Sequence, residues 1–370
     1  MKILQVSTYY PPNFGGIEQV AYDLSCILKK QGNEVKVICF NNSNQTISNT
    51  YDGVEVVRIG YKSKIASQAI SLRYFFKLKE VIKKFKPDII HIHLPNPLIA
   101  TYLLVLKPKC KIILHWHSDI IKQKRLKMVY APLENAILQR ADSIVATSRM
   151  YAEKSDALRR FLNKVVVIPN IVETEFLDTV SVENINRITE IRDKYLGKKI
   201  IFFIGVHREY KGLRYLIESC QYLSDDYVVL IAGNGPLTEN LKQKAVDLNL
   251  GNIEFIGRIS DEEKKCYLLT ADVFAFPSIT KNEAFGIALA EALYCGLPAV
   301  TFHIDGSGVN WVNQDSVTGI EVKHFSAQEY ALALMNVSRE KYGENAQRWV
   351  RENFTEKVIW NVVKQLFNTV

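Results

Sequence analysis

Short apolar runs alternate with longer amphipathic segments along the whole chain. Runs rich in Val and Ile predict buried strands, and segments whose apolar residues recur every three or four positions predict helices. In the first half, the clearest helical patterns cover Gly16–Gln31 and Leu72–Phe85. The predicted strands of this half are Ile3–Ser7, Val35–Phe40, Val54–Ile59, Asp88–His93, Lys111–His115, Ser143–Thr147 and Val165–Ile168.

The second half repeats this alternation. Its predicted strands are Ile200–Ile204, Tyr227–Ala232, Asn252–Ile256, Asp272–Phe276 and Pro298–Thr301. Strands that alternate with helices form parallel sheets with helices on both faces. The pattern therefore predicts an α/β chain of two Rossmann-like domains facing each other across a cleft. The ligand is expected at the carboxyl ends of the strands.

The length of 370 residues also suits two domains rather than one. Residues 169–194 contain few large apolar side chains, so we expect the boundary there. We assign residues 1–175 to the first domain and residues 176–355 to the second.

The composition is that of an ordinary globular protein, with 48% hydrophobic and 23% charged residues. No apolar run reaches the ~20 residues that a membrane-spanning helix needs. The first residues, Met1–Ser7, form a predicted strand and lack the apolar core of a signal peptide. Six cysteines are scattered without a Cys-x-x-Cys pair, as expected for reduced thiols of a cytoplasmic protein.

The formal net charge of +8 conceals an asymmetry between the two halves. Residues 1–170 hold 26 Lys and Arg against 12 Asp and Glu, a net of +14, whereas residues 171–370 hold 21 against 27, a net of −6. A basic half predicts an anionic partner, either nucleic acid or a membrane surface.

Two basic segments favour the membrane. Residues 61–86 carry eight Lys and Arg against one Glu, with apolar residues at helical spacing, and residues 120–130 have the same character. A basic amphipathic helix binds anionic lipid, although many such helices only present a solvated face. No nucleic-acid-binding motif is present. We therefore expect a cytoplasmic protein bound peripherally to the inner face of the cytoplasmic membrane.

The stretch Pro277–Leu293 contains the most specific candidate chemistry. Glu283 and Glu291 lie eight residues apart, and the backbone between them is predicted to begin a helix. Free N–H groups at a helix N-terminus bind anions, and Gly286 would let a ligand approach the backbone. Two carboxylates flanking such a site suit a molecule made of a sugar, a diphosphate and a ribose. The plainer alternative is a capping Glu followed by a solvated one.

This stretch resembles the Glu-x7-Glu signature of the retaining glycosyltransferases of family 4, which have the two-domain GT-B fold. The resemblance extends through Glu291–Val300 and Gly306–Gly319 and covers nearly the whole chain. It is strongest to hexosyltransferases, often mannosyltransferases, that build bacterial surface polysaccharides such as O-antigen and exopolysaccharide. It also implies that a last helix, within residues 356–370, packs back on the first domain.

The resemblance implies roles for the second domain. Glu291 would bind the ribose hydroxyls, and Glu283 would act in catalysis by binding sugar hydroxyls. The backbone that assists them is that of Ala284, Phe285, Gly286 and Ile287. Lys211 matches the family's phosphate-binding lysine directly, but the usual arginine position is Val206 here, and Arg208 is its expected substitute. Residues expected along the nucleotide are Asn234, Arg258 and Ile259.

In the first domain, Gly15 and Gly16 open a predicted helix beside the donor phosphates and the acceptor. They do not form the Gly-x-Gly-x-x-Gly fingerprint of dinucleotide-binding domains. His117 matches a family histidine that contacts the donor sugar near the reaction centre, and Asp119 is expected beside it at the acceptor. A metal site at His115, His117 and Asp119 is disfavoured because no further ligand cluster is present.

We therefore expect a retaining, metal-independent transferase that uses a GDP- or UDP-hexose, with mannose as the first candidate sugar. The expected acceptor is a lipid-linked oligosaccharide. Two alternatives remain open: a nucleotide-sugar epimerase of the same fold, which needs no acceptor, and a non-catalytic sugar-nucleotide sensor.

Overall fold

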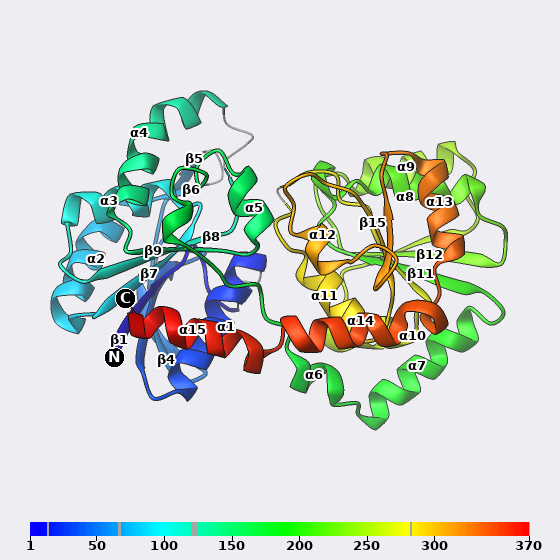
Figure 1. Ribbon diagram of the computed structural model, residues 1–370, viewed down its shortest axis with the longest axis horizontal. Helices are drawn as coiled ribbons and strands as arrows, with labels where there is room; N and C mark the ends of the chain where they lie inside the picture. Colours follow the sequence, from blue (N-terminus) through cyan, green and yellow to red (C-terminus); the bar gives the residue numbers. More distant parts are fainter. Residues whose placement is uncertain (13–14, 66–67, 120–123, 282, 370) are drawn as a thin grey trace. The chain divides into compact units, whose positions relative to one another are not determined.

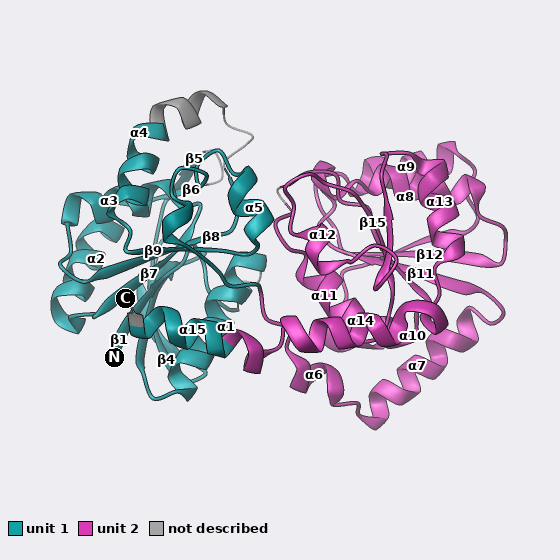
Figure 2. Cartoon of the chain, viewed as in Figure 1, with its two compact units in different colours: residues 1–169, 360–370 teal, residues 170–359 magenta. Residues whose placement is uncertain are grey.

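A computed structural model describes residues 1–12, 15–65, 68–119, 124–281 and 283–369. The chain forms two compact units (Figure 2). Unit 1 comprises residues 1–169 and 360–370, and unit 2 comprises residues 170–359. The chain leaves unit 1 after Pro169 and returns to it within the last helix, α15 (Glu356–Thr369).

Unit 1 is built on an eight-stranded sheet with the order β10-β9-β8-β7-β1-β2-β4-β3. Neighbouring strands are parallel except for the edge strand β3, which runs antiparallel to β4. Its strands are β1 (Lys2–Val6), β2 (Glu34–Phe40), β3 (Ile47–Tyr51), β4 (Val54–Ile59), β7 (Ile89–Leu94), β8 (Lys111–Trp116), β9 (Ser143–Ala146) and β10 (Val165–Val167).

The helices of unit 1 connect these strands (Figure 1). They are α1 (Gly16–Lys30), α2 (Leu72–Phe85), α3 (Pro97–Leu106), α4 (Lys124–Arg140), α5 (Arg149–Lys154) and the turn η1 (Leu162–Lys164). A short antiparallel hairpin, β5 (Ser63–Ile65) and β6 (Gln68–Ile70), precedes α2. The last helix adds buried Val363 and Phe367 to the unit, so its apolar side belongs to this core.

Unit 2 is built on a six-stranded, fully parallel sheet with the order β13-β12-β11-β14-β15-β16. This is the strand order of doubly wound nucleotide-binding domains. Its strands are β11 (Lys199–Ile204), β12 (Tyr227–Ala232), β13 (Ile253–Gly257), β14 (Val273–Phe276), β15 (Ala299–Phe302) and β16 (Gly319–Val322).

Helices cover both faces of the unit 2 sheet (Figure 1). In β11, β12 and β14, even-numbered residues such as Phe202 and Phe274 pack against α7 (Val182–Lys194), α10 (Asp261–Thr270), α11 (Ile287–Tyr294) and α14 (Arg339–Asn353). The odd-numbered residues of these strands pack against α8 (Leu213–Ser219), α9 (Thr238–Asp247) and α13 (Ala327–Asn336). The remaining short helices are α6 (Thr174–Asp178), α12 (Val309–Val312) and the turns η2 (Glu209–Lys211) and η3 (Cys220–Tyr222).

The predicted α/β fold is confirmed, and each predicted strand coincides with an observed one to within one residue at its ends. The sequence analysis did not predict β3, β16 or the β5–β6 hairpin. The stretch 169–194, where the domain boundary was expected, is largely helical, and the two units divide at its first residue.

Candidate active site

The strand order of unit 2 changes direction between β11 and β14, and the loops after these strands meet there. The first loop runs from Gly205 to Gly212 and the second from Pro277 to Gly286. The N–H of Ile279 donates to the carbonyl of Tyr210 at 2.9 Å, which joins the two loops. Crevices at such reversals bind ligands in open α/β sheets, so the candidate donor site lies here.

Lys211 and Glu283 connect these loops by an ion pair. The two side chains are only 11% and 13% exposed, and the Ser278 hydroxyl donates to the same carboxylate at 3.0 Å. The Lys211 ammonium also lies 4.8 Å from the centre of the Phe276 ring. A poorly solvated pair of this kind holds a cation and an anion ready at the mouth of the site.

The helix after this loop, α11, begins at Ile287, between Glu283 and Glu291, where the sequence predicts a helix start. Among the described residues, no side chain caps its N-terminus, so the first N–H groups are available to an anion. Gly286 has φ +90°, and a Cβ there would lie 2.9 Å from Cζ of Phe276. The glycine is therefore needed for the backbone turn and for packing against Phe276, apart from any approach of a ligand.

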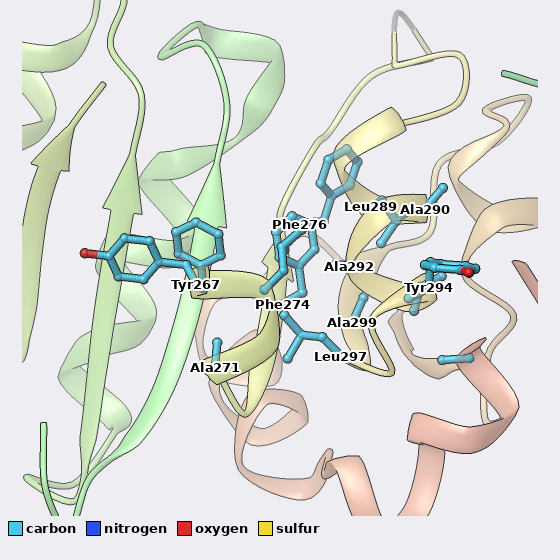
Figure 3. Close-up of a cluster of buried hydrophobic side chains, with 14 of the residues drawn as sticks. Tyr267, Ala271, Phe274, Phe276, Leu289, Ala290, Ala292, Tyr294, Leu297 and Ala299 are labelled. Atoms are coloured by element: carbon cyan, nitrogen blue, oxygen red, sulfur yellow. The ribbon is translucent and has the colours of Figure 1, made fainter. Parts of the chain in front are cut away.

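The hydrophobic core fixes the direction of α11 (Figure 3). Leu289, Ala290 and Ala292 on the helix pack with Phe274 and Phe276 of β14, and all five side chains are fully buried. Small Ala side chains let the helix lie close to the strand, so the uncapped N-terminus is held rigidly.

Glu291 pairs with Lys264, a residue that the sequence analysis missed. Lys264 Nζ lies 2.9 Å from Glu291 Oε1 and 3.1 Å from Asp261, and the side chains of Lys264 and Glu291 are 15% and 14% exposed. Burial works to lower the pKa of Lys264, but the two carboxylates outweigh it and raise that pKa above its ordinary value. The lysine therefore stays charged beside the carboxylate predicted to bind ribose.

Backbone hydrogen bonds join three glycine-containing segments at the ends of β11, β12 and β13. Gly205 donates to the carbonyl of Ala232 at 3.3 Å, and Gly233 donates to that of Gly257 at 2.6 Å. A Cβ on Gly233, which has φ +104°, would lie 2.0 Å from the carbonyl oxygen of Gly205. These contacts form a backbone wall along the carboxyl edge of the sheet.

The three predicted nucleotide-side residues follow this wall. Asn234 and Arg258 are exposed, and Ile259 is half-buried against the core. Val206, at the position of the expected arginine, is exposed and apolar. Arg208 is also exposed, and within the described part of the chain its guanidinium makes no ion pair. It is thus free to bind an anion, unlike Lys211.

Unit 1 has an equivalent reversal of strand order between β1 and β7. The Asn96 amide after β7 donates to the Thr8 hydroxyl after β1 at 3.1 Å. Gly15 is the N-cap of α1, no side chain in the described part of the chain caps this end, and Gly15 and Gly16 are both exposed. The carboxylate of Glu18 lies beside Gly15, and burial raises the pKa of Glu18.

Arg58 supports the loop that leads to these glycines, a role that the sequence analysis missed. It lies in the buried strand β4. Its guanidinium donates to the carbonyl of Tyr10 and to Oδ1 of Asn49, each at 3.0 Å, and also to the carbonyl of Pro11. The remainder of the loop includes residues 13–14, which lie outside the described residues.

Four histidines form a buried stack on one face of the unit 1 sheet. His91 and His93 come from β7, His115 comes from β8, and His117 follows β8 at the carboxyl edge. Ring centres of His115 and His117 lie 4.3 Å apart at an angle of 4°. Burial lowers the pKa of His91 and of His117 to about 3, and it lowers those of the other two as well. All four rings are therefore neutral at pH 7.

Nitrogen atoms of His93, His115 and His117 lie within 4.8 Å of one another, which is a possible metal site. Asp119, which the sequence placed with them, is not part of this group. A metal ion must lie in the plane of each coordinating ring, about 2.0–2.1 Å from its nitrogen. Three rings stacked within 18° of parallel direct their lone pairs side by side instead of toward one point. The stack therefore does not fit a common metal ion.

Asp119 is held within unit 1 and is buried. Its carboxylate accepts from Trp116 Nε1 at 2.9 Å and from the Ser155 hydroxyl at 2.7 Å. Its N–H donates to the Tyr151 hydroxyl at 2.6 Å. These bonds fix the chain just after His117, so Asp119 positions this segment.

The basic segments lie on unit 1. Within residues 61–86, α2 occupies Leu72–Phe85 as predicted, whereas the residues before it form the β5–β6 hairpin. Leu72 and Phe76 are 67% and 62% exposed beside the basic side chains of α2. Of the segment 120–130, residues 120–123 lie outside the described part of the chain. None of the helices described is long and apolar enough to cross a membrane.

Comparison with known families matches both halves of the chain. Residues 14–176 match the family described as Glycosyltransferase Family 4. Residues 184–355 match the family described as Glycosyl transferases group 1.

Individual relatives extend over nearly the full length. The O-antigen chain mannosyltransferase C of Escherichia coli is 32% identical over 376 residues, covering 100% of this chain and 99% of the relative. The D-rhamnosyltransferase WbpZ of Pseudomonas aeruginosa is 31% identical over 361 residues, covering 96% and 92%.

Solved structures with low sequence identity share the fold. A sucrose-phosphate synthase from Thermosynechococcus elongatus has a TM-score of 0.81 at 19% identity, covering 100% of this chain and 98% of its own. Anabaena HepE in complex with UDP and glucose has a TM-score of 0.76 at 18% identity, covering 100% and 99%.

Proposed function

Because the chain belongs to the family 4 glycosyltransferases of the GT-B fold, we propose that it is a retaining hexosyltransferase. The donor is a nucleotide-diphosphate sugar, and the acceptor is a lipid-linked oligosaccharide of a bacterial surface polysaccharide, O-antigen or exopolysaccharide. The observation that carries this proposal is the Lys211–Glu283 pair beside the uncapped N-terminus of α11. Together they offer a cation, a carboxylate and free N–H groups at the end of the central strands of unit 2.

Unit 2 binds the donor in this proposal. Glu291 accepts hydrogen bonds from the ribose hydroxyls, and the Lys264 ammonium, 2.9 Å from its Oε1, holds that carboxylate in a fixed direction. The loops containing Asn234 and Arg258 lie along the base. A carboxylate that is already oriented loses less conformational entropy when the ribose binds.

The diphosphate lies at the mouth of α11. Lys211 and Arg208 stabilise the negative charge that grows on the leaving nucleotide, and the N–H groups of Phe285, Gly286 and Ile287 add to this. Glu283 then exchanges its ammonium partner for hydroxyls of the sugar. Fixed cations can perform the leaving-group stabilisation that other transferases obtain from a metal ion, so we propose metal-independent transfer.

Retention follows when the acceptor attacks on the face from which the nucleotide leaves. The departing phosphate takes the acceptor proton, and no protein nucleophile is required. His117 contacts the donor sugar and takes part in catalysis, and the backbone of Gly15 and Gly16 lies along the acceptor and the donor phosphates. Unit 1 thus binds the acceptor, with Asp119 fixing the segment that bears His117.

The names of the relatives support mannose as the first candidate sugar. One is a mannosyltransferase and the other a D-rhamnosyltransferase, and D-rhamnose is 6-deoxymannose. GDP-mannose is therefore the first donor to test, followed by GDP-rhamnose and UDP-glucose.

The membrane partner follows from α2. Exposed Leu72 and Phe76 can enter the lipid interface while Arg73, Lys79 and Lys83 remain at the anionic headgroups. A protein docked in this way reaches a lipid-linked acceptor from the cytoplasmic side.

Donor binding is tested by thermal melting with UDP, GDP and ADP, each with and without EDTA. A nucleotide at about 100 times its Kd stabilises the fold by about 2.7 kcal/mol, which for a domain of this size is roughly 5–10 °C. One nucleotide should stabilise the wild type regardless of EDTA and fail to stabilise Glu291→Ala. If none stabilises the wild type, the proposed donor site is wrong.

Transfer is tested with GDP-mannose and a polyprenyl-diphosphate-linked oligosaccharide, and NMR reads the anomeric configuration of the product. The proposal expects an α-linked product from the α-linked donor. Conversion of the donor sugar without an acceptor would identify an epimerase instead, and nucleotide binding without any turnover would identify a sensor.

A further inference from the structure

A chain of hydrogen bonds crosses three adjacent strands of unit 1. Gln5 Oε1 on β1 lies 3.0 Å from His93 Nε2 on β7. His93 Nδ1 in turn lies 3.0 Å from His117 Nε2, beyond the end of β8. β1, β7 and β8 are neighbours in the sheet, so the chain runs straight across its centre.

The positions of the protons follow from the chemistry of the groups. A neutral imidazole has one N–H donor and one acceptor nitrogen. Since the amide oxygen of Gln5 can only accept, His93 Nε2 carries the proton and His93 Nδ1 is an acceptor. His117 Nε2 must then donate to His93, and His117 Nδ1 is left with a lone pair. Burial keeps both rings neutral at pH 7.

Burial singles out His117 as the end of this chain that can meet a ligand. Gln5 and His93 are completely buried, whereas His117 is 8% exposed at the carboxyl edge of the sheet. The stacked rings of His91 and His115 are equally buried, but none of their nitrogens has a hydrogen-bond partner among the described residues. The chain of bonds is thus confined to Gln5, His93 and His117.

We infer that Gln5 and His93 are positioning residues that hold His117 in its Nε2–H tautomer, so that Nδ1 accepts a hydrogen bond from a hydroxyl of the sugar substrate. The role of the sugar in this inference rests on the proposed function. The tautomer itself does not, because it follows from bonds within unit 1. Rotating the Gln5 amide by 180° would reverse the donor and acceptor in each of these hydrogen bonds. The two amide orientations therefore predict opposite tautomers for His117.

The tautomer is measured by ¹⁵N NMR of protein labelled at histidine, with the His117 signals assigned from His117→Gln. In the wild type at pH 7, His117 Nε2 should give a protonated nitrogen signal and Nδ1 an unprotonated one. Gln5→Met removes the acceptor and should produce a mixture of both tautomers at His117. A protonated Nδ1 in the wild type, or an unchanged His117 in Gln5→Met, would overturn the inference.

Two further variants separate positioning from packing. Gln5→Glu retains an acceptor oxygen toward His93 and should restore the wild-type tautomer. His91→Leu removes a buried imidazole from the same face without removing a hydrogen bond, and should leave the His117 signals in the wild-type pattern. If His91→Leu disturbs them as much as Gln5→Met does, the chain of bonds has no special role.

Kinetics supply the last readout. Gln5→Met should lower kcat for sugar transfer about tenfold, the value of about one neutral hydrogen bond, yet cause no further loss in a His117→Gln background. Additive losses would show that Gln5 acts on the fold rather than through His117. Absence of any transfer by the wild type would count against the proposed function alone, since the NMR result stands independently.

Discussion

The two units share a winding pattern but differ in the chemistry at the point where the strand order reverses. In unit 2 that point holds charged groups in poorly solvated pairs, Lys211 with Glu283 and, nearby, Lys264 with Glu291. In unit 1 it holds neutral polar groups, with Gln5 and the histidine stack beneath. The fold therefore supplies the place for a site, and a few side chains decide what it binds.

The net charges of the two halves do not match this distribution of charged site residues. Residues 1–170 carry +14 and residues 171–370 carry −6, although the cations proposed to bind phosphate are in the second half. The basic side chains of unit 1 lie on its surface, as on α2, while unit 2 concentrates a few cations within its candidate site. The proposed phosphate site therefore rests on local geometry and not on the net charge of a domain.

Each unit also contains an arginine that is buried (Arg58) or half-buried (Arg339) and has no carboxylate partner among the described residues. Arg58 donates to carbonyls of the loop before Gly15 in unit 1. Arg339 donates to carbonyls at the ends of α10 and α11 in unit 2, those of Leu268, Ala271 and Cys295. Arg58 thus supports the loop proposed to bind ligand, whereas Arg339 stabilises helix ends, because charged donors satisfy buried carbonyls strongly.

The largest effect should come from Lys211→Met. Loss of a preorganised cation at the leaving group should reduce turnover by about 100-fold to 1000-fold, the cost of removing one such stabilising group. The variant also leaves the Glu283 carboxylate without its ammonium partner, so its melting temperature should fall. Steady-state kinetics at saturating donor and thermal melting measure the two effects separately.

A double variant tests whether the lower melting temperature comes from the unpaired Glu283 carboxylate. Lys211→Met combined with Glu283→Gln removes both charges, and it should recover most of the melting temperature without recovering turnover. Recovery of turnover together with stability would mean that Lys211 only holds the loops together.

The next effect concerns Lys264→Met, which removes the ammonium that orients Glu291. Nucleotide affinity should fall about 10-fold to 150-fold, because charge-assisted hydrogen bonds contribute about 1.5–3 kcal/mol, while kcat at saturating donor should change little. Calorimetric titration with the bound nucleotide measures this. Lys244→Met is the matched control, since it breaks a 2.7 Å ion pair with Glu218 between α8 and α9. Equal losses of nucleotide affinity in both variants would mean that breaking any ion pair of unit 2 weakens binding, and that Lys264 has no specific role.

Much of this fold could be predicted from sequence, because strands buried on both faces appear as continuous apolar runs. β7 and β12, for example, are buried at every position. The edge strand β3 is mostly exposed and polar, so its residues show no such run. β16 is short and follows a turn rather than a clear helix, which hides it from the same criterion.

The candidate site was only partly predictable. The Glu-x7-Glu motif located Glu283 and Glu291, and the strand-end rule located Lys211. Lys264 belongs to a run of charged residues at the start of α10 that resembles a solvated helix face, and only packing brings it to Glu291. The bond between His93 and His117 likewise joins residues 24 positions apart. Such partners depend on the register of neighbouring elements, which a single sequence does not reveal.

Acid should affect unit 1 through its histidine stack. The pKa of His91 is about 3 in the fold, well below the ordinary value of 6.5, because burial disfavours the charged ring. The unfolded chain therefore binds more protons between these values. Stability is fully present above pH 6.5 and falls as the pH drops toward 3, by up to about 1.4 kcal/mol per pH unit for each such ring.

Melting temperatures of His91→Leu/His115→Leu, compared with the wild type at pH 7 and pH 5, test this. Neither ring has a hydrogen-bond partner among the described residues, so the replacement should be tolerated at pH 7 and should reduce the loss at pH 5. His303→Gln/His324→Gln in unit 2 is the control, since both rings remain in contact with solvent. An unchanged loss at pH 5 in the unit 1 variant would mean that the burial of His91 and His115 does not set the acid sensitivity.

The smallest expected effect is on membrane binding, which should depend on the surface of unit 1 and not on that of unit 2. Lys83→Gln on α2 should weaken binding to vesicles containing anionic lipid about fivefold, since each basic residue near such a surface contributes about 1 kcal/mol. Lys242→Gln on α9 removes one charge from unit 2 and should leave vesicle binding unchanged. Phe76→Ser should weaken binding by a similar amount at high salt, where the lysine effect disappears, because its contribution is apolar. Vesicle sedimentation at two salt concentrations measures all three. Equal weakening by the Lys242 and Lys83 variants would show that overall charge, and not the surface of α2, brings the protein to the membrane.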